Sequence, residues 1–131
     1  MGSNILYVED NPDNMVLVKR ALEARGYKLF QAVNGLEGVD VAEKENIDLI
    51  LLDINLPDID GYEVARRLRG NNVRPNLAYV PIIAITANAL KGDAGKALSA
   101  GCDVYMSKPI NIHELWARVE GFVPSPKGLA K

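Results

Sequence analysis

Short apolar runs alternate five times with longer segments of helical periodicity along this chain. The runs predict strands at residues 5–8, 28–32, 48–53, 81–86 and 103–106. Three of these runs are almost uninterrupted apolar sequence, which is typical of parallel strands that helices cover on both faces. The alternation therefore predicts one α/β domain of the (βα)5 type, with three layers and right-handed crossovers.

The segments between the runs carry signals for the start and the end of helices. Asn11 can cap the first helix, Pro12 fits its first position, and Gly26 ends it. Asn111 can cap the last helix in the same way. The other three helices are predicted at about 36–45, from about 61 onward and at about 90–100.

The third predicted helix has an apolar side and a basic side. Val64 and Leu68 are expected to point into the core. Arg66, Arg67 and Arg69 are expected to form a face in water. This arrangement is typical of a helix that packs on a sheet by one side.

Length and composition fit a single globular domain. The chain has 131 residues, 48% of them hydrophobic and 24% charged, which is enough to bury a core. We expect the domain to span residues 1–123, with a flexible tail at 124–131 that contains two prolines and a glycine. A polar connection at 70–79 is long for this type of domain.

Charge and composition exclude several classes of function. The formal net charge is −2, so no basic field points to nucleic acid as a direct ligand. The single cysteine, Cys102, excludes a disulfide framework and a cysteine-based zinc site. No apolar stretch approaches the roughly 20 residues that span a membrane, and the N-terminus lacks a secretion signal. We therefore expect a cytoplasmic protein without membrane contact.

Acidic side chains follow two of the predicted strands. Asp53 comes at the end of the most apolar run, and Glu9 and Asp10 follow the first run. Because the carboxyl ends of parallel strands meet at one edge of the sheet, we expect these carboxylates to share a site, with Asp53 exposed at the rim. Clustered carboxylates repel one another and need a cation, and their oxygen ligands suit Mg2+.

Two further strands end in side chains of a different kind. Thr86 ends the fourth run, and Lys108 follows the fifth. A hydroxyl donor and an ammonium group beside a metal-binding acid cluster suit a phosphoryl group. The chain has no Gly-rich phosphate loop, so nucleotide binding is not expected, and with one histidine, His113, it offers no histidine-ligated metal site. These residues predict a site that holds a phosphoryl group on a carboxylate.

Four segments carry the pattern of a known family: ILYVEDN (5–11), DLILLDINLPDIDGYE (48–63), PIIAITANA (81–89) and GCDVYMSKPI (101–110). Together they resemble the receiver domain of two-component response regulators, over about Asn4 to Val123. The resemblance implies a flavodoxin-like domain with a five-stranded parallel sheet in the order 2-1-3-4-5. It also implies a phosphoacceptor of a two-component system or phosphorelay, which is a signalling domain and not a turnover enzyme.

The resemblance implies a role for each residue of the predicted site. Asp53 would be the phosphoacceptor, which receives its phosphoryl group from a histidine kinase or a histidine phosphotransferase. Glu9, Asp10 and Asp53 would hold Mg2+ together with the backbone carbonyl of Asn55. Lys108 would bind the phosphoryl group as its counter-ion.

The same resemblance implies a conformational switch. Thr86 would follow the phosphoryl group, and Tyr105 would turn into the space that Thr86 leaves. Pro109 would shape the loop through a cis peptide bond, and Asn88 would lie at the rim of the pocket. The fourth helix, the fifth strand and the fifth helix would then present a changed face to a downstream target protein.

Three alternatives differ in what they require of the sequence. An aspartate-nucleophile phosphatase of the haloacid-dehalogenase type needs a second Asp two residues after the nucleophile, where this chain has Asn55. A flavodoxin-like cofactor carrier needs a hydroxyl- and glycine-rich loop after the first strand, where this chain has EDNPDN. Within the receiver family, the chain could be excised from a hybrid histidine kinase or a longer regulator. The short tail and the Met just before the first strand favour a freestanding regulator.

Overall fold

Five parallel strands form the central sheet of this computed structural model, which describes residues 3–87 and 92–126. The order of the strands is β2-β1-β3-β4-β5, as predicted. The strands are β1 (Asn4–Val8), β2 (Lys28–Ala32), β3 (Leu49–Asp53), β4 (Ile82–Thr86) and β5 (Val104–Ser107). The helices are α1 (Pro12–Ala24), α2 (Gly35–Lys44), α3 (Gly61–Arg69), the 3-10 helix η1 (Pro75–Tyr79), α4 (Asp93–Ser99) and α5 (Ile112–Phe122).

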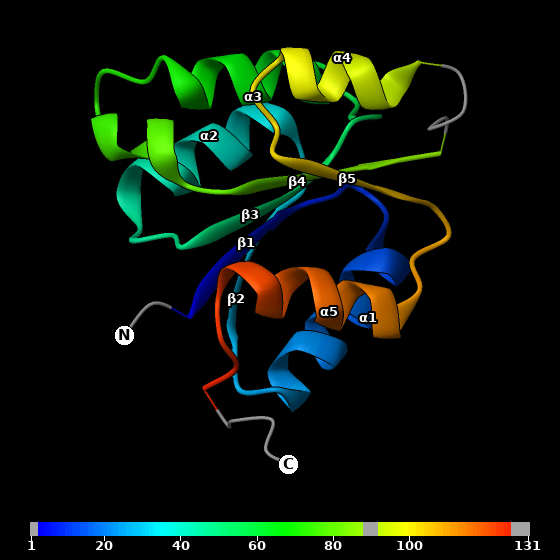
Figure 1. Cartoon of the computed structure of the whole chain (residues 1–131). Coiled ribbons are helices and arrows are strands. Elements are labelled where there is room, and N and C mark those ends of the chain that lie inside the picture. Colours follow the sequence, from blue (N-terminus) through cyan, green and yellow to red (C-terminus); the bar gives the residue numbers. More distant parts are fainter. Residues whose placement is uncertain (1–2, 88–91, 127–131) are drawn as a thin grey trace.

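Helices cover both faces of the sheet. Figure 1 shows α1 and α5 on one face and α2, α3 and α4 on the other. Each face has its own cluster of buried apolar side chains. Every residue of the inner strands β3 and β4 is buried, because neighbouring strands and both helix layers surround them. The predicted three-layer architecture is confirmed.

Local sequence signals explain where the elements begin and end. Each strand begins and ends within one residue of its predicted position. The Asn11 side chain caps α1 by accepting two backbone N–H hydrogen bonds, and Asn111 caps α5. Gly26, just beyond α1, has a φ of 89°, a conformation that favours glycine. The fourth predicted helix begins at Asp93, and residues 90 and 91 lie outside the described ranges.

One arginine of α3 does not face water, contrary to the sequence-based expectation. Arg69 donates hydrogen bonds to the backbone carbonyls of Leu77 (2.9 Å) and Val80 (2.6 Å). It also donates to the carbonyl of Gly101 (2.8 Å) and forms an ion pair with Asp103 (2.8 Å). The guanidinium carries five donors in a fixed fork, so it joins the end of α3 to the segments before β4 and β5. The other two arginines of α3 are exposed, as predicted.

The long connection at 70–79 contains η1 and is bound to the end of α2. Asn71 donates to the Glu43 carboxylate (2.6 Å). Arg74 donates to the Glu43 carbonyl (3.0 Å) and to the side chain of Asn46 (2.6 Å). The connection leads to the amino end of β4, so it lies at the end of the sheet opposite to the predicted site.

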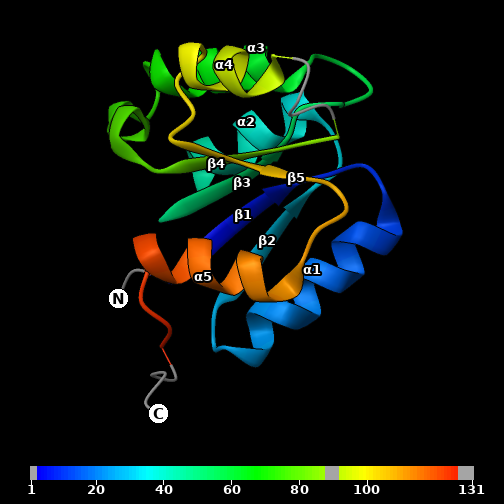
Figure 2. The same cartoon turned by 45° about the vertical axis from the view of Figure 1, so that its right-hand side comes forward.

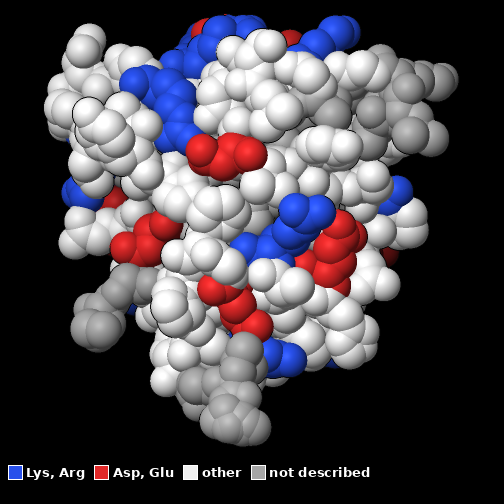
Figure 3. All heavy atoms as spheres, viewed as in Figure 1, with Lys and Arg blue, Asp and Glu red and all other residues white. Residues whose placement is uncertain are grey.

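The surface has a mixed charge distribution on the face seen in Figure 3, where acidic and basic side chains are interspersed among uncharged ones. In the described part of the chain, no helix is long and apolar enough to cross a membrane. After α5, the Ser125 hydroxyl donates to the Arg25 carbonyl. The predicted tail is described only to residue 126.

Candidate functional site

The predicted site lies at the edge of the sheet where the parallel strands end. Glu9 and Asp10 follow β1, Asp53 ends β3, Thr86 ends β4 and Lys108 follows β5. These four strands are neighbours in the sheet, and Figure 2 shows the segments after β1 and β5 at the same edge. Topology therefore brings together residues that are up to 99 positions apart in the sequence.

Three carboxylates form the centre of the site. One oxygen from each of Glu9, Asp10 and Asp53 lies within 4.8 Å of the other two. Asp10 is exposed, whereas the Glu9 and Asp53 side chains are each 1% exposed. The expectation that Asp53 would be exposed at the rim is wrong, because Lys108 lies against one of its oxygens and the Asn55 backbone N–H against the other.

Lys108 links two of the acids. Its Nζ lies 3.0 Å from Asp53 Oδ2 and 3.5 Å from Glu9 Oε1. The Lys108–Pro109 peptide bond is cis, and the Lys108 backbone N–H donates to the Thr86 carbonyl (2.9 Å). Burial lowers the pKa of Lys108. The hydrogen bond to Asp53 and the negative charges of Asp53 and Glu9 raise it by more than burial lowers it, so the pKa of Lys108 lies above its ordinary value. The lysine therefore remains a cation.

Asp53 and Glu9 have opposite pKa shifts. Burial raises the pKa of Asp53 to about 6, although the hydrogen bonds from Lys108 and the Asn55 N–H oppose this. Burial also raises the pKa of Glu9, but the Asn11 N–H and other donors outweigh it, and its pKa falls below the ordinary value. Near neutral pH, Glu9 is therefore charged, and Asp53 gains more than Glu9 from a nearby cation.

Tyr7 belongs to the site and was missed from the sequence, where it counts as part of an apolar run. Its hydroxyl donates to Glu9 Oε1 at 2.9 Å, and the tyrosine is fully buried. Burial and the charge of Glu9 raise the pKa of Tyr7, so its hydroxyl keeps its proton. Strand alternation could have found this contact, because residues two apart in a strand point to the same face.

The two residues predicted to switch lie on neighbouring strands. Thr86 is fully buried at the end of β4. Tyr105 on β5 is 38% exposed and pairs in register with Ala84, two residues before Thr86. All three side chains therefore point to the same face of the sheet. Asn88, predicted at the pocket rim, lies outside the described residues.

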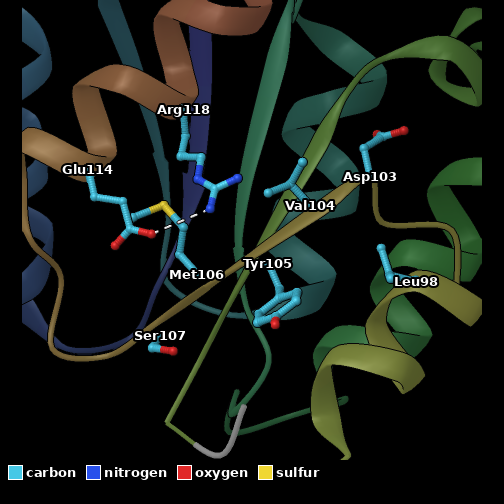
Figure 4. A pocket seen from close by; sticks show the side chains of 8 residues that line it. All are labelled: Leu98, Asp103, Val104, Tyr105, Met106, Ser107, Glu114 and Arg118. Carbon is cyan, nitrogen blue, oxygen red and sulfur yellow. Dashed lines mark ion pairs between the residues drawn. The ribbon is translucent and has the colours of Figure 1, made fainter. Parts of the chain in front are cut away.

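A shallow pocket lies beside Tyr105, on the outer side of β5 (Figure 4). Leu98 of α4 lines it on one side, and Glu114 and Arg118 of α5 line it on the other. The two charged side chains form an ion pair of 3.7 Å. This face thus combines a partly exposed aromatic ring, an apolar side chain and fixed charges, which is the composition of many protein-binding surfaces.

Fold and site together define a flavodoxin-like α/β domain with an acid cluster and a lysine at the carboxyl edge of its sheet. The family model of the response regulator receiver domain matches residues 5–120, so the chain belongs to this family. This membership decides against the phosphatase and the flavodoxin-like cofactor carrier. The predicted resemblance is confirmed.

Individual relatives agree with this result. The polar-differentiation response regulator DivK of Brucella anthropi is 38% identical over 123 residues, which cover 94% of this chain and 98% of DivK. The receiver domain of the sensor histidine kinase PA1611 from Pseudomonas aeruginosa, with magnesium in its active site cleft, is 39% identical, with a TM-score of 0.85. The match covers 95% of this chain and 100% of that one.

A third relative comes from a complex. It is in the co-crystal structure of the Saccharomyces cerevisiae histidine phosphotransfer signaling protein Ypd1 and the receiver domain of its downstream response regulator Ssk1. The matched chain is 32% identical, with a TM-score of 0.84, and the match covers 92% of this chain and 88% of that one. Receiver domains from bacteria and yeast therefore share this fold.

Proposed function

We propose that the protein is a Mg2+-dependent phosphoacceptor switch, which takes a phosphoryl group from a phosphohistidine onto Asp53. The observation that carries the proposal is the environment of this carboxylate. Asp53 is buried beside two other acids, and a lysine lies 3.0 Å from one of its oxygens. This arrangement supplies a nucleophile, ligands for a divalent cation and a fixed positive charge at one point.

The residues present fit a magnesium ion. Glu9, Asp10 and Asp53 offer oxygen ligands within 4.8 Å of one another, and the backbone carbonyl of Asn55 would complete the set supplied by the protein. When bound, the ion would withdraw charge from the oxygens of the phosphoryl group during its transfer. The magnesium in the cleft of the PA1611 receiver domain supports this part of the proposal.

The protein's own residues perform the transfer by position and charge. An oxygen of Asp53 attacks the phosphorus, the bond from phosphorus to the histidine nitrogen breaks, and its electron pair stays on that nitrogen. The Asn55 N–H, 3.0 Å from Asp53 Oδ1, holds the carboxylate in place. Lys108 then binds one phosphoryl oxygen and the Thr86 hydroxyl donates to another. Such self-catalysed transfer makes the domain a signalling switch and not a turnover enzyme.

Phosphorylation would change the face built from α4, β5 and α5. It makes Asp53 more negative and adds acceptor oxygens, and Thr86 moves toward them. Tyr105, on the same face of the sheet, turns into the space that is left. The α4-β5-α5 face then binds a downstream target protein through a shift between two packings.

Two observations support the partners that we propose. The complex of Ypd1 with the Ssk1 receiver domain supports a histidine phosphotransferase or a histidine kinase as the phosphoryl donor. The match over 98% of DivK, which is named a response regulator, supports a response regulator as the kind of protein. The alternative, a receiver from a hybrid histidine kinase, has support of its own from the PA1611 receiver domain.

Intact-mass spectrometry after incubation with acetyl phosphate tests the proposal. We expect one phosphoryl adduct on the wild-type protein with Mg2+, and none without Mg2+ or on Asp53→Asn. Removing Mg2+ with a chelator before the incubation gives the matched control. An unmodified wild-type protein, or an adduct on Asp53→Asn, would contradict the assignment of Asp53 as the acceptor.

A further inference from the structure

The first acid of the cluster has a longer side chain than its neighbours and is fixed by several donors. The Tyr7 hydroxyl lies 2.9 Å from Glu9 Oε1, and the Asn11 N–H lies 3.1 Å from Oε2. Asn14 Nδ2 and Lys108 Nζ lie farther from Oε1, at 3.4 Å and 3.5 Å. The two shorter contacts bind opposite oxygens, so together they set the plane of the carboxylate.

Tyr7 is the rigid member of this set. Its ring is fully buried in the apolar cluster between the sheet and helices α1 and α5. A packed aromatic side chain has few torsions left to vary, so its hydroxyl is a fixed point. Glu9 has three side-chain torsions, and without such a point its carboxylate could turn within the site.

The Tyr7 hydroxyl also affects which acid Lys108 binds. By occupying a lone pair of Glu9 Oε1, Tyr7 satisfies this oxygen without a second charge. Lys108 then lies closer to Asp53 (3.0 Å) than to Glu9 (3.5 Å). If the hydroxyl were absent, Glu9 Oε1 would keep only its longer contacts to Asn14 and Lys108, and it could draw the lysine toward itself and away from Asp53.

We propose that Tyr7 is a positioning residue of the metal site, whose hydroxyl holds Glu9 toward the cation and leaves Lys108 to the phosphoacceptor. This inference rests on the proposed function, since it names a residue that prepares the same site. Groups that orient metal ligands commonly change metal affinity by about 10- to 100-fold when they are removed. Tyr7 acts through Glu9, so its effect depends on the length of the side chain at position 9.

Tyr7→Phe removes the hydroxyl and keeps the ring in the core. The chain offers a matched control, because Tyr27 is also buried and its hydroxyl donates to the Val123 carbonyl away from the site. Titration of each protein with MgCl2, followed by the NMR signals of the backbone amides, gives the Kd. We expect Tyr7→Phe to weaken Mg2+ binding by about 10-fold and Tyr27→Phe to leave it unchanged.

A second background shows whether the hydroxyl acts through Glu9. In Glu9→Asp, the shorter carboxylate no longer reaches the hydroxyl, so adding Tyr7→Phe is expected to change the Kd by less than about 2-fold. Equal Mg2+ affinity of Tyr7→Phe and wild type, or the same loss in both backgrounds, overturns the positioning role and leaves the proposed function intact. A wild-type protein that does not bind Mg2+ overturns both.

Discussion

Asp53 lies in a buried position, where an ionised carboxylate destabilises the folded protein. In the absence of a cation, burial raises its pKa from 3.8 to about 6, because the protein interior solvates an ionised carboxylate poorly. The unfolded chain releases the proton near pH 4, and the folded protein releases it only near pH 6. Stability is therefore lost as the pH rises through this interval, since the unfolded state binds fewer protons there. The ionised carboxylate of Asp53 therefore lowers the stability of the metal-free protein near neutral pH.

This leads to a prediction for Asp53→Asn. In metal-free buffer at pH 7.5, we expect the variant to unfold with a free energy about 1–3 kcal/mol higher than wild type, because the amide cannot ionise. At pH 4.5 or below, most of this gain is expected to vanish, since Asp53 is protonated in the folded wild type. Urea unfolding at the two pH values measures the difference. Equal stability of the two proteins at pH 7.5 would contradict the prediction.

At the scale of elements, Arg69 fastens the end of α3 to two other parts of the chain. Its guanidinium binds carbonyls of η1 and of the segments before β4 and β5, together with Asp103. Its side chain is 20% exposed. The interaction joins α3 and η1 to the segments before β4 and β5, at the end of the molecule opposite to the site.

We expect Arg69→Met to lower the free energy of unfolding by about 2–4 kcal/mol, because it leaves several carbonyls and one carboxylate without this donor. Arg67→Met is the matched control. Arg67 is exposed and pairs with Glu63 on the surface, so we expect its loss to cost less than about 0.5 kcal/mol. Chemical denaturation of both variants checks the contrast. Similar losses in the two would mean that Arg69 contributes no more than a surface pair.

The switch also belongs to this scale, because it connects β4 with the face formed by α4, β5 and α5. We expect Tyr105→Ala to accept a phosphoryl group from acetyl phosphate at the wild-type rate, since the ring does not contact Asp53 in any described interaction. We also expect phosphorylation to shift fewer backbone amide signals of β5 and α5 in the variant. NMR spectra recorded before and after phosphorylation measure this. If phosphorylation shifts the same β5 and α5 signals in Tyr105→Ala as in the wild-type protein, the aromatic switch is contradicted.

At the scale of the whole molecule, the sequence was sufficient to predict the architecture. Apolar runs such as Leu49–Leu52 are strong signals because β3 is covered on both faces and needs no polar alternation. Once the strands are known to be parallel, their carboxyl ends must share one edge. The meeting of Glu9, Asp53 and Lys108 follows from that geometry alone.

Side-chain details were harder to predict because they depend on contacts between distant segments. One oxygen of Asp53 is covered by Lys108, which lies 55 positions away. Arg69 has the composition of a surface residue, and its carbonyl partners lie 8 to 32 positions along the chain. Tyr7 looked like a core aromatic, and only its place two residues before Glu9 hinted at a polar contact. The local sequence pattern predicts which face of an element a residue occupies, but it does not predict which distant residue contacts it there.

The attachment of the last helix has a practical consequence. After α5, the Val123 carbonyl accepts a hydrogen bond from Tyr27, the residue just before β2. The amino end of β2 pairs with Asn4 at the start of β1, so both ends of the described chain lie at the same end of the sheet (Figure 1). The acid cluster lies at the other end. A tag or a surface linker joined at either terminus would therefore lie away from the acid cluster and would not obstruct the approach of a phosphoryl donor.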